Sequence, residues 1–265
     1  KTIEDEFGFP VLIRGKGGVR LTENGRALLP AIREILNAND HMDQIVANIR
    51  GMSFGRLRIG TFASASVLWL PKIIEEFSHD YPGIQIEIIV GGNDSLISQL
   101  DESCIDFAIM SNPPQGYEWI QLASDRMLVL LPPGHRLVDK DRVTLDEIDD
   151  DPFILSNEGF DYDVSQIIKG SGITPRLSFS TMENRGIIAM IQHGLGVTVM
   201  PEMVLDSLES NVITKELAPC EYRHMGIIVK SVNTASLAAK TFISYAKRII
   251  SELGTYPPID GELNA

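Results

Sequence analysis

Short polar sequences follow several apolar segments of this chain, and their residue types suit the binding of a small molecule. Residues Thr61–Ser66 carry three hydroxyl groups directly after the apolar segment Leu57–Gly60. Gly92-Asn93 and Ser111-Asn112 follow two further apolar segments. Where a helix begins after a strand, its first backbone N–H groups have no partner within the helix. They and the nearby hydroxyls can therefore bind an anion or another polar group.

These polar residues also have simpler interpretations. A hydroxyl such as that of Ser64 can cap the following helix and do nothing else. Gly, Asn and Ser are common in turns for backbone reasons alone, which covers Gly92-Asn93 and Ser111-Asn112. A carboxylate such as Glu158 or Glu183 stabilises a helix N-terminus without any ligand. The residue types alone leave both interpretations open.

A second kind of chemistry is indicated by a basic hairpin near the N-terminus. Residues 14–20 read RGKGGVR, where the glycines allow a tight turn and Arg14, Lys16 and Arg20 project from it. Such cations can contact phosphates or the minor groove of DNA, where they position a protein rather than read bases. The alternative is a solvated basic turn.

A long amphipathic helix is predicted from Glu23 to Arg50, with Thr22 as its N-cap and residues 51–55 as a hinge. It would be about 42 Å long, too long and narrow to bury an apolar stripe within one small domain. Pairing of two copies is therefore favoured over packing on the body. Asn39 either fixes the register of that pair or marks a boundary between two shorter helices. The apolar stripe consists of Leu28, Leu29, Ile32, Ile35, Leu36, Met42, Ile45, Val46 and Ile49.

Beyond the hinge, short apolar strands alternate with amphipathic helices, which is typical of an α/β fold with a largely parallel sheet. The last strand and helix are expected to return to the first of two similar units, so that two strands cross between them. The expected strands are 57–60, 84–90, 106–110, 127–131, 176–180, 196–200 and 226–230. The expected helices are 70–79, 94–102, 164–169, 183–193 and 235–253.

The charge is distributed unevenly along the chain. Residues 1–56 hold eight Lys and Arg against seven Asp and Glu, whereas residues 57–265 hold 15 against 29. An acidic body is repelled by a phosphate backbone, so any contact with nucleic acid must come from the N-terminal end or from residues before it.

Several classes of protein are disfavoured by what the sequence lacks. It contains no GxSxG, P-loop or HExxH motif and no GxGxxG motif after a strand, so we do not expect an enzyme. The five histidines and the two cysteines, Cys104 and Cys220, show no metal-ligand spacing, and no cofactor or metal is expected. The longest apolar runs are far shorter than the roughly 20 residues of a membrane span. Because the start has no signal-peptide pattern, we expect a cytoplasmic protein.

The order of motifs along the whole chain resembles that of LysR-type transcriptional regulators. The N-terminal part resembles the end of the recognition helix, the wing and the start of the linker helix in that family. Phe7, Val11 and Leu12 depart from it, since Leu, Leu and Phe are more usual there. The matching motifs are Ile3-Glu4, Phe7-Gly8, 11–14 (VLIR), 19–25 (VRLTENG), 57–60 (LRIG), Leu70-Pro71, Tyr81-Pro82, Gly92-Asn93, 105–109 (IDFAI), 194–197 (GLGV) and Met200-Pro201.

The resemblance implies an α/β fold of two interleaved subdomains of periplasmic-binding-protein type, preceded by a winged-helix remnant and a long linker helix. It implies the wing and truncated head in residues 1–22, the linker helix and hinge in 23–52, regulatory subdomain I in 57–124 plus 229–254, and regulatory subdomain II in 125–228. It also implies a homodimer or a dimer of dimers that binds DNA through the complete head and a small-molecule effector through the body. Because only the end of the head is present, we do not expect residues 1–22 to bind DNA alone.

In this family the resemblance places the effector in the cleft between the subdomains. Ser64 aligns with a polar position that commonly contacts effectors and is the strongest candidate. Arg185 is the only arginine found in or beside the candidate loops, so the sequence does not decide the charge of the effector. The candidate effector-binding residues are Ser64, Ala65, Ser66, Asn93, Ser111, Asn112, Glu158, Thr181 and Met182, and the candidate DNA contacts are Arg14, Lys16 and Arg20.

An extracytoplasmic solute-binding protein is the main alternative, because its two-part body would produce the same pattern of strands and helices. The wing and the linker helix argue against it. The mass in solution discriminates the two classes. The stripe on the linker helix predicts a dimer or tetramer, whereas solute-binding proteins are usually monomers.

Overall fold

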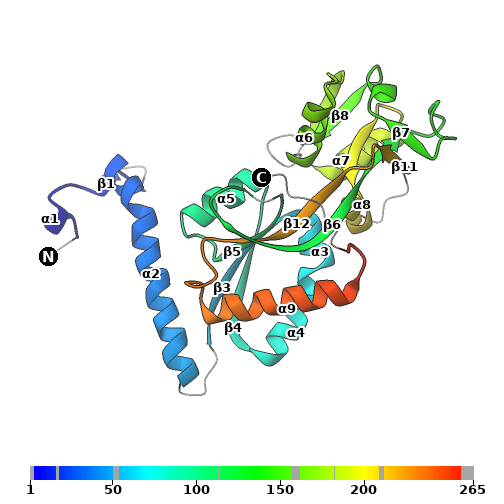
Figure 1. Cartoon of the computed structure of the whole chain (residues 1–265). Coiled ribbons are helices and arrows are strands. Elements are labelled where there is room, and N and C mark those ends of the chain that lie inside the picture. The colour runs from blue at the N-terminus through cyan, green and yellow to red at the C-terminus, as the bar shows by residue number, and fades with distance from the viewer. Residues whose placement is uncertain are drawn as a thin grey trace.

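The chain forms a hairpin, one long helix and a two-part α/β body (Figure 1). The computed structural model describes residues 3–15, 18–49, 54–112, 114–156, 162–181, 183–208 and 212–257. We call β3–β5 with α3–α5 and α9 subdomain I, and β7–β11 with α6–α8 subdomain II. Strands β6 and β12 run between the two.

The N-terminal elements are α1 (Ile3–Phe7), β1 (Leu12–Gly15), β2 (Gly18–Leu21) and α2 (Glu23–Ile49). The two strands pair antiparallel, as expected of a wing. The predicted N-cap is confirmed, because the Gly25 backbone N–H donates to Thr22 Oγ1 at 2.9 Å. The Thr22 hydroxyl donates in turn to the Pro10 carbonyl at 2.9 Å, which ties the segment before the hairpin to the start of the helix.

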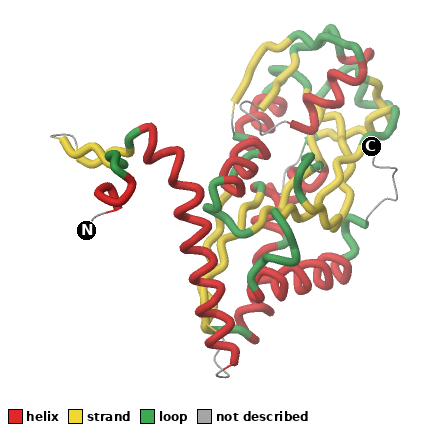
Figure 2. The backbone as a smooth tube through the Cα atoms, turned by 60° about the vertical axis from the view of Figure 1, so that its left-hand side comes forward, coloured by secondary structure: helices red, strands yellow, loops and turns green. Residues whose placement is uncertain are grey.

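Helix α2 lies beside subdomain I (Figure 2). Arg33 pairs with Glu102 at 2.8 Å, and the Asn37 amide donates to the Ser103 carbonyl at 3.1 Å. The helix therefore contacts its own body through polar side chains. Five stripe residues are exposed: Ile35, Leu36, Met42, Ile45 and Val46.

Subdomain I is a parallel three-stranded sheet with helices on both faces, extended by β12. Strand β3 lies between β4 and β5 and pairs parallel with both. Its main core contains large aromatic side chains, with Phe242 of α9 packed 5.1 Å from Phe77 of α4 between ring centres. The elements are β3 (Phe54–Thr61), α3 (Ala63–Leu68), α4 (Leu70–Asp80), β4 (Gly83–Val90), α5 (Asn93–Asp101), β5 (Phe107–Ser111) and α9 (Leu237–Leu253).

Subdomain II has two separate apolar cores and shorter strands. Strands β8 and β9 pair parallel, whereas β10 and β11 pair antiparallel with the end of β6. The elements are β7 (Arg142–Thr144), the 3-10 helix η1 (Asp146–Ile148), β8 (Phe153–Ser156), α6 (Tyr162–Ser171), β9 (Leu177–Thr181), α7 (Asn184–Gln192), β10 (Thr198–Pro201), α8 (Glu202–Leu208) and β11 (Ile213–Ala218).

The crossing strands β6 (Glu118–Leu131) and β12 (Tyr222–Val229) join the subdomains and pair antiparallel along their length. The sheet order is β4-β3-β5-β12-β6-β11-β7, with β10 also paired to β6. The prediction of a largely parallel sheet is therefore wrong. A chain that crosses into subdomain II on one strand must come back on another, and the returning strand runs in the opposite direction. The predicted return to subdomain I is confirmed, since β12 also pairs with β5.

A glycine allows the crossing strands to lie close together. The pairing register shifts between Met225 and Gly226. A Cβ at Gly226 would lie 2.5 Å from the Ile120 carbonyl oxygen and 2.6 Å from the Trp119 ring. We expect Gly226→Ala to lower the free energy of unfolding by about 1–3 kcal/mol, because the strands must separate to admit the methyl group. Urea denaturation measures this.

The matched control is Gly170→Ala in helix α6, where nothing lies within 4 Å of the new Cβ. There alanine should stabilise the helix by about 0.5–1 kcal/mol. Equal effects of the two substitutions would contradict the close approach at Gly226.

Candidate functional site

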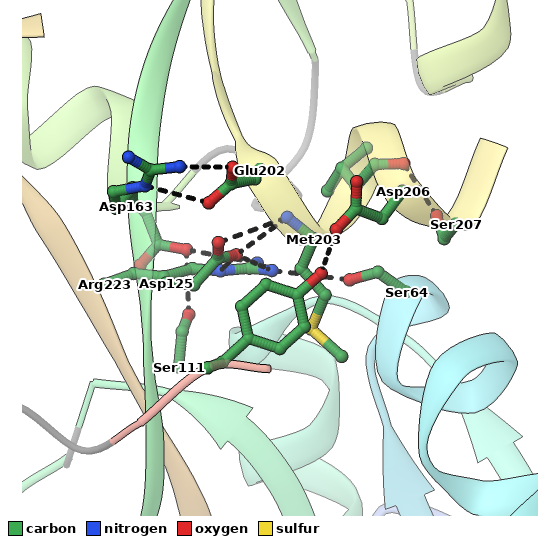
Figure 3. A network of polar contacts seen from close by, with 12 residues as sticks. Ser64, Ser111, Asp125, Asp163, Glu202, Met203, Asp206, Ser207 and Arg223 are labelled. Atoms are coloured by element: carbon green, nitrogen blue, oxygen red, sulfur yellow. Dashed lines mark hydrogen bonds and ion pairs between the residues drawn. The ribbon is translucent and has the colours of Figure 1, made fainter. Parts of the chain in front are cut away.

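A buried ion pair lies where the crossing strands pass between the subdomains (Figure 3). Arg223 of β12 and Asp125 of β6 are register partners, so their side chains lie on the same face of the strand pair. Arg223 Nε and Nη2 lie 2.9 and 2.8 Å from Asp125 Oδ2. The carboxylate is fully buried and the arginine is 6% exposed, so neither charge is solvated.

The Asp125 carboxylate also connects to subdomain II. Its two oxygens accept the Met203 backbone N–H at 3.1 and 3.3 Å, at the start of helix α8. A helix start favours negative charge because its N–H groups are free. Asp125 thus has two partners that offset the cost of its burial.

Subdomain I supplies a hydroxyl and an aromatic ring to Arg223. The guanidinium carbon lies 4.8 Å above the centre of the Phe62 ring. Arg223 Nη2 donates to Ser64 Oγ at 3.4 Å, and Ser64 is 3% exposed. Both residues lie at the start of helix α3, directly after strand β3.

Asp163, in the first turn of α6, carries the network across to subdomain II. Its Oδ2 accepts the Ser111 hydroxyl at 3.0 Å and its Oδ1 accepts the Asn112 amide at 2.6 Å. The same carboxylate lies 3.8 Å from Arg223 Nη1. On the side of subdomain I, the Asn93 amide donates to the Ser111 carbonyl at 2.9 Å. One carboxylate of subdomain II therefore bonds directly to two strand-end residues of subdomain I.

The network holds two carboxylates and one guanidinium. Burial raises the pKa of the Asp125 carboxyl, and the guanidinium of Arg223 partly opposes this. Burial likewise raises the pKa of the Asp163 carboxyl, against Arg223 and the Ser111 hydroxyl. Arg223 is fully matched by Asp125, so the charge of Asp163 is in excess.

A pocket of about 900 Å³ opens beside the network, between helix α6 and the segments around β7 and β11. Asp163, Arg223 and Asn112 are part of its wall, and further carboxylates come from Asp146 and Glu221. The rest of the wall is mixed. It comprises Thr144, Leu145, Gln166, Ile167, Gly170, Ser171, Leu217, Ala218, Pro219 and Tyr222.

The structure brings four of the predicted residues together in the network: Ser64, Asn93, Ser111 and Asn112. Ala65 instead lies fully buried in the core of subdomain I. The Ser66 hydroxyl donates to its own helix, at Ala63 O, and Thr181 Oγ1 accepts the nearby Glu183 N–H. The predicted residues Glu158 and Met182 lie outside the described residues.

The capping interpretation of Ser64 is wrong. The N-cap of α3 is Phe62, which makes no side-chain cap, and the Ser64 hydroxyl faces Arg223 instead.

The structure adds three residues that the sequence analysis missed: Asp125, Asp163 and Arg223. The arginine at the site is Arg223 rather than Arg185, which is exposed on α7. Both strand residues fell outside the predicted strands, which covered only the apolar ends of β6 and β12. For Asp125, the available signal was its place between Ala123 and Met127, the apolar residues two positions away on either side.

Two of the predicted DNA contacts lie on the exposed hairpin. Arg14 is paired with Val19 and Arg20 with Ile13. Because neighbouring residues in a strand point to opposite faces, the two arginines lie on opposite faces of the hairpin. Lys16 lies outside the described residues.

The fold and the site define a two-subdomain ligand-binding body attached to a long helix. A family model described as the LysR substrate binding domain matches residues 50–250. YvbU of Bacillus subtilis (strain 168), described as an uncharacterized HTH-type transcriptional regulator, is 33% identical over 250 residues, 93% of this chain and 86% of YvbU. The regulatory domain of Synechocystis PCC6803 CcmR in complex with 2-PG matches at TM-score 0.68 and 20% identity, covering 75% of this chain and 98% of that one. HinK, a LysR family transcriptional regulator from Pseudomonas aeruginosa, matches at TM-score 0.63 and 24% identity, covering 94% of this chain and 85% of HinK.

The chain belongs to the LysR family. It is a LysR-type transcriptional regulator, and its body is the effector-binding domain with a fold of periplasmic-binding-protein type. The alternative of a solute-binding protein without DNA function is not favoured. Within the described ranges, no helix has the length and apolar character to cross a membrane, and no three or more His, Cys, Asp or Glu side chains are grouped to hold a metal.

Proposed function

We propose that the effector of this regulator binds at the network between the subdomains, in the pocket beside Asp163 and Arg223. The supporting observation is that Asp163 of subdomain II bonds directly to Ser111 and Asn112 of subdomain I. A ligand that contacts these groups changes the contact by which the subdomains hold one another. The site residues on this proposal are Ser64, Asn93, Ser111 and Asn112, together with Asp125, Asp163 and Arg223.

Binding at this position would bias the angle between the subdomains, because the ligand favours whichever arrangement it contacts better. Strands β6 and β12 pass from one subdomain to the other at the same place, and they supply Asp125 and Arg223. The C-terminal segment forms a second link, since the Tyr256 hydroxyl donates to Asp206 of α8. Helix α2 contacts subdomain I through Arg33 and Asn37, so a change of angle moves subdomain II relative to the linker helix.

The remaining features follow from the same proposal. We propose a cytoplasmic regulator without enzymatic activity or cofactor, divided into residues 1–22, 23–52, 57–124 plus 229–254, and 125–228. Pairing through α2 gives a homodimer or a dimer of dimers. Contacts to DNA come from the complete head, with Arg14, Lys16 and Arg20 on the wing touching phosphates or the minor groove.

A thermal-shift panel of amino acids, aromatic acids and other small metabolites tests the site, since a ligand of the native state raises the melting temperature. We expect a stabilising compound to bind Ser64→Ala about 2- to 10-fold more weakly, because the substitution removes a buried hydrogen bond that holds Arg223, a residue of the pocket wall. Ser66→Ala is the matched control, because its hydroxyl bonds within its own helix. Arg14→Ala on the wing should also leave binding unchanged. If Ser64→Ala and Ser66→Ala weaken binding equally, the compound does not bind at the proposed site.

A further inference from the structure

We propose that Asp163 is the residue that sets the charge specificity of the effector site: it occupies the anion-binding position of the site from within the chain. The site therefore selects an effector that carries an ammonium group and rejects carboxylates. This inference rests on the proposed function, since it names the chemical class of ligand for the same site.

The groups around the Asp163 carboxylate are those that would bind the carboxylate of a ligand. A hydroxyl donates to one oxygen, from Ser111 at 3.0 Å, and an amide donates to the other, from Asn112 at 2.6 Å. The guanidinium of Arg223 lies 3.8 Å away. Two directed donors on separate oxygens, with a cation beside them, form an anion-binding site. Asp163 is 8% exposed, so its carboxylate fills this site rather than bordering it.

An external carboxylate would have to compete with a tethered one. Intramolecular partners act at effective concentrations of millimolar or above, which a free anion must exceed. The displaced Asp163 carboxylate would then lie beside the incoming one, and two like charges in one buried site repel. The single positive charge of Arg223 is already paired with Asp125 through Nε and Nη2, so it cannot balance two further carboxylates.

The pocket beside the network has the complementary charge for a cation. Its wall contains the carboxylates of Asp146, Asp163 and Glu221 against the single guanidinium of Arg223. An ammonium group entering there pairs with Asp163 without displacing it. The apolar part of the wall, including Ile167 and Leu217, suits a carbon skeleton attached to that group.

Acetate tests the position of Asp163 without knowledge of the effector. Asp163→Ala removes the carboxylate and leaves the donors of Ser111, Asn112 and Arg223 facing the vacated space. We expect acetate to raise the melting temperature of Asp163→Ala saturably, at a concentration at least about ten-fold below any that affects the wild type. Chloride at equal ionic strength should not do so. Asp139→Ala, which removes an exposed carboxylate of subdomain II, is the matched control. A folded Asp163→Ala protein that responds to acetate no better than this control would overturn the proposal.

Matched pairs of probes test the selectivity in the wild type, which also serves if Asp163→Ala fails to fold. Phenethylamine and 3-phenylpropionate carry their charged group on the same phenethyl chain, and butane-1,4-diamine and adipate carry two charged groups on the same four-carbon chain. We expect the amines to raise the melting temperature and the acids to leave it unchanged. If the acids stabilise the wild type and Ser64→Ala weakens the effect while Ser66→Ala does not, the proposed site stands and the charge specificity fails. If no compound of either class stabilises the wild type, the proposed effector site fails, and the acetate result still decides the role of Asp163.

Discussion

Asp125→Ala should lower the free energy of unfolding by about 3–5 kcal/mol, because removing one partner of a buried ion pair leaves the other charge uncompensated. Asp125 is fully buried and Arg223 is 6% exposed, so water cannot replace the lost carboxylate. The substitution also frees the Met203 backbone N–H at the start of α8. Asp163 cannot take over, since its carboxylate lies 3.8 Å from the guanidinium and bonds to Ser111 and Asn112.

Urea denaturation of the wild type and the variant measures this difference. The control is Glu76→Ala, which breaks a partly exposed pair with Arg248 and should cost much less than Asp125→Ala, because water screens exposed charges. The double variant Asp125→Ala, Arg223→Met should be more stable than Asp125→Ala alone, because an apolar side chain replaces the stranded charge. A loss below about 1 kcal/mol in Asp125→Ala would mean that the pair contributes little to the stability of the crossing strands.

Much of the architecture was predictable because it follows from local periodicity. The apolar segments at β3, β4 and β5 and the amphipathic helices α4, α7 and α9 were predicted within a few residues of their observed bounds. Each depends on residues close in the sequence. Short elements without a periodic apolar pattern were missed, among them α3, α8 and β11.

The site was predictable only in part, and the reason is physical. The polar residues at the ends of β3 and β5 were identified because turn chemistry and strand ends are local features. The partner of Arg223 is 98 positions away in the sequence, and the two meet through the register of β6 and β12. No local pattern determines such a register. Asp163 was equivalent, in sequence, to any acidic residue at a helix start.

The linker helix is the opposite case. Its sequence pattern predicts a contact with a second chain, which the structure of a single chain cannot show. A stripe of apolar residues was predicted to pair with a second copy. In the single chain, the polar side of α2 contacts the body through Arg33 and Asn37, while Ile35 and Met42 remain 70% and 55% exposed. These two residues are seven positions apart and therefore lie on the same face of the helix.

Replacing Ile35 and Met42 with glutamate should convert the protein to monomers over the concentration range in which the wild type is oligomeric. Burying each of these side chains in a pair of helices is worth about 1.5–3 kcal/mol, and the variant loses four of them per dimer while gaining repulsion between carboxylates. An increase in the dimer dissociation constant of at least about 100-fold requires only about 2.7 kcal/mol of that loss. Sedimentation velocity or light scattering measures the change.

Leu195→Glu with Leu253→Glu provides the matched control, because both leucines are exposed apolar residues of the body, at 43% and 45%. These substitutions add the same charge without touching α2, so the control should keep the assembly of the wild type. If the Ile35→Glu, Met42→Glu variant assembles as the wild type does, the chains pair through another surface, and the exposed stripe is not the dimer contact. If both double variants become monomers, the added charge rather than the linker helix accounts for the dissociation. If only the α2 variant loses its assembly, the chains pair through this helix. The position of each body is then linked to the spacing of two DNA-binding heads.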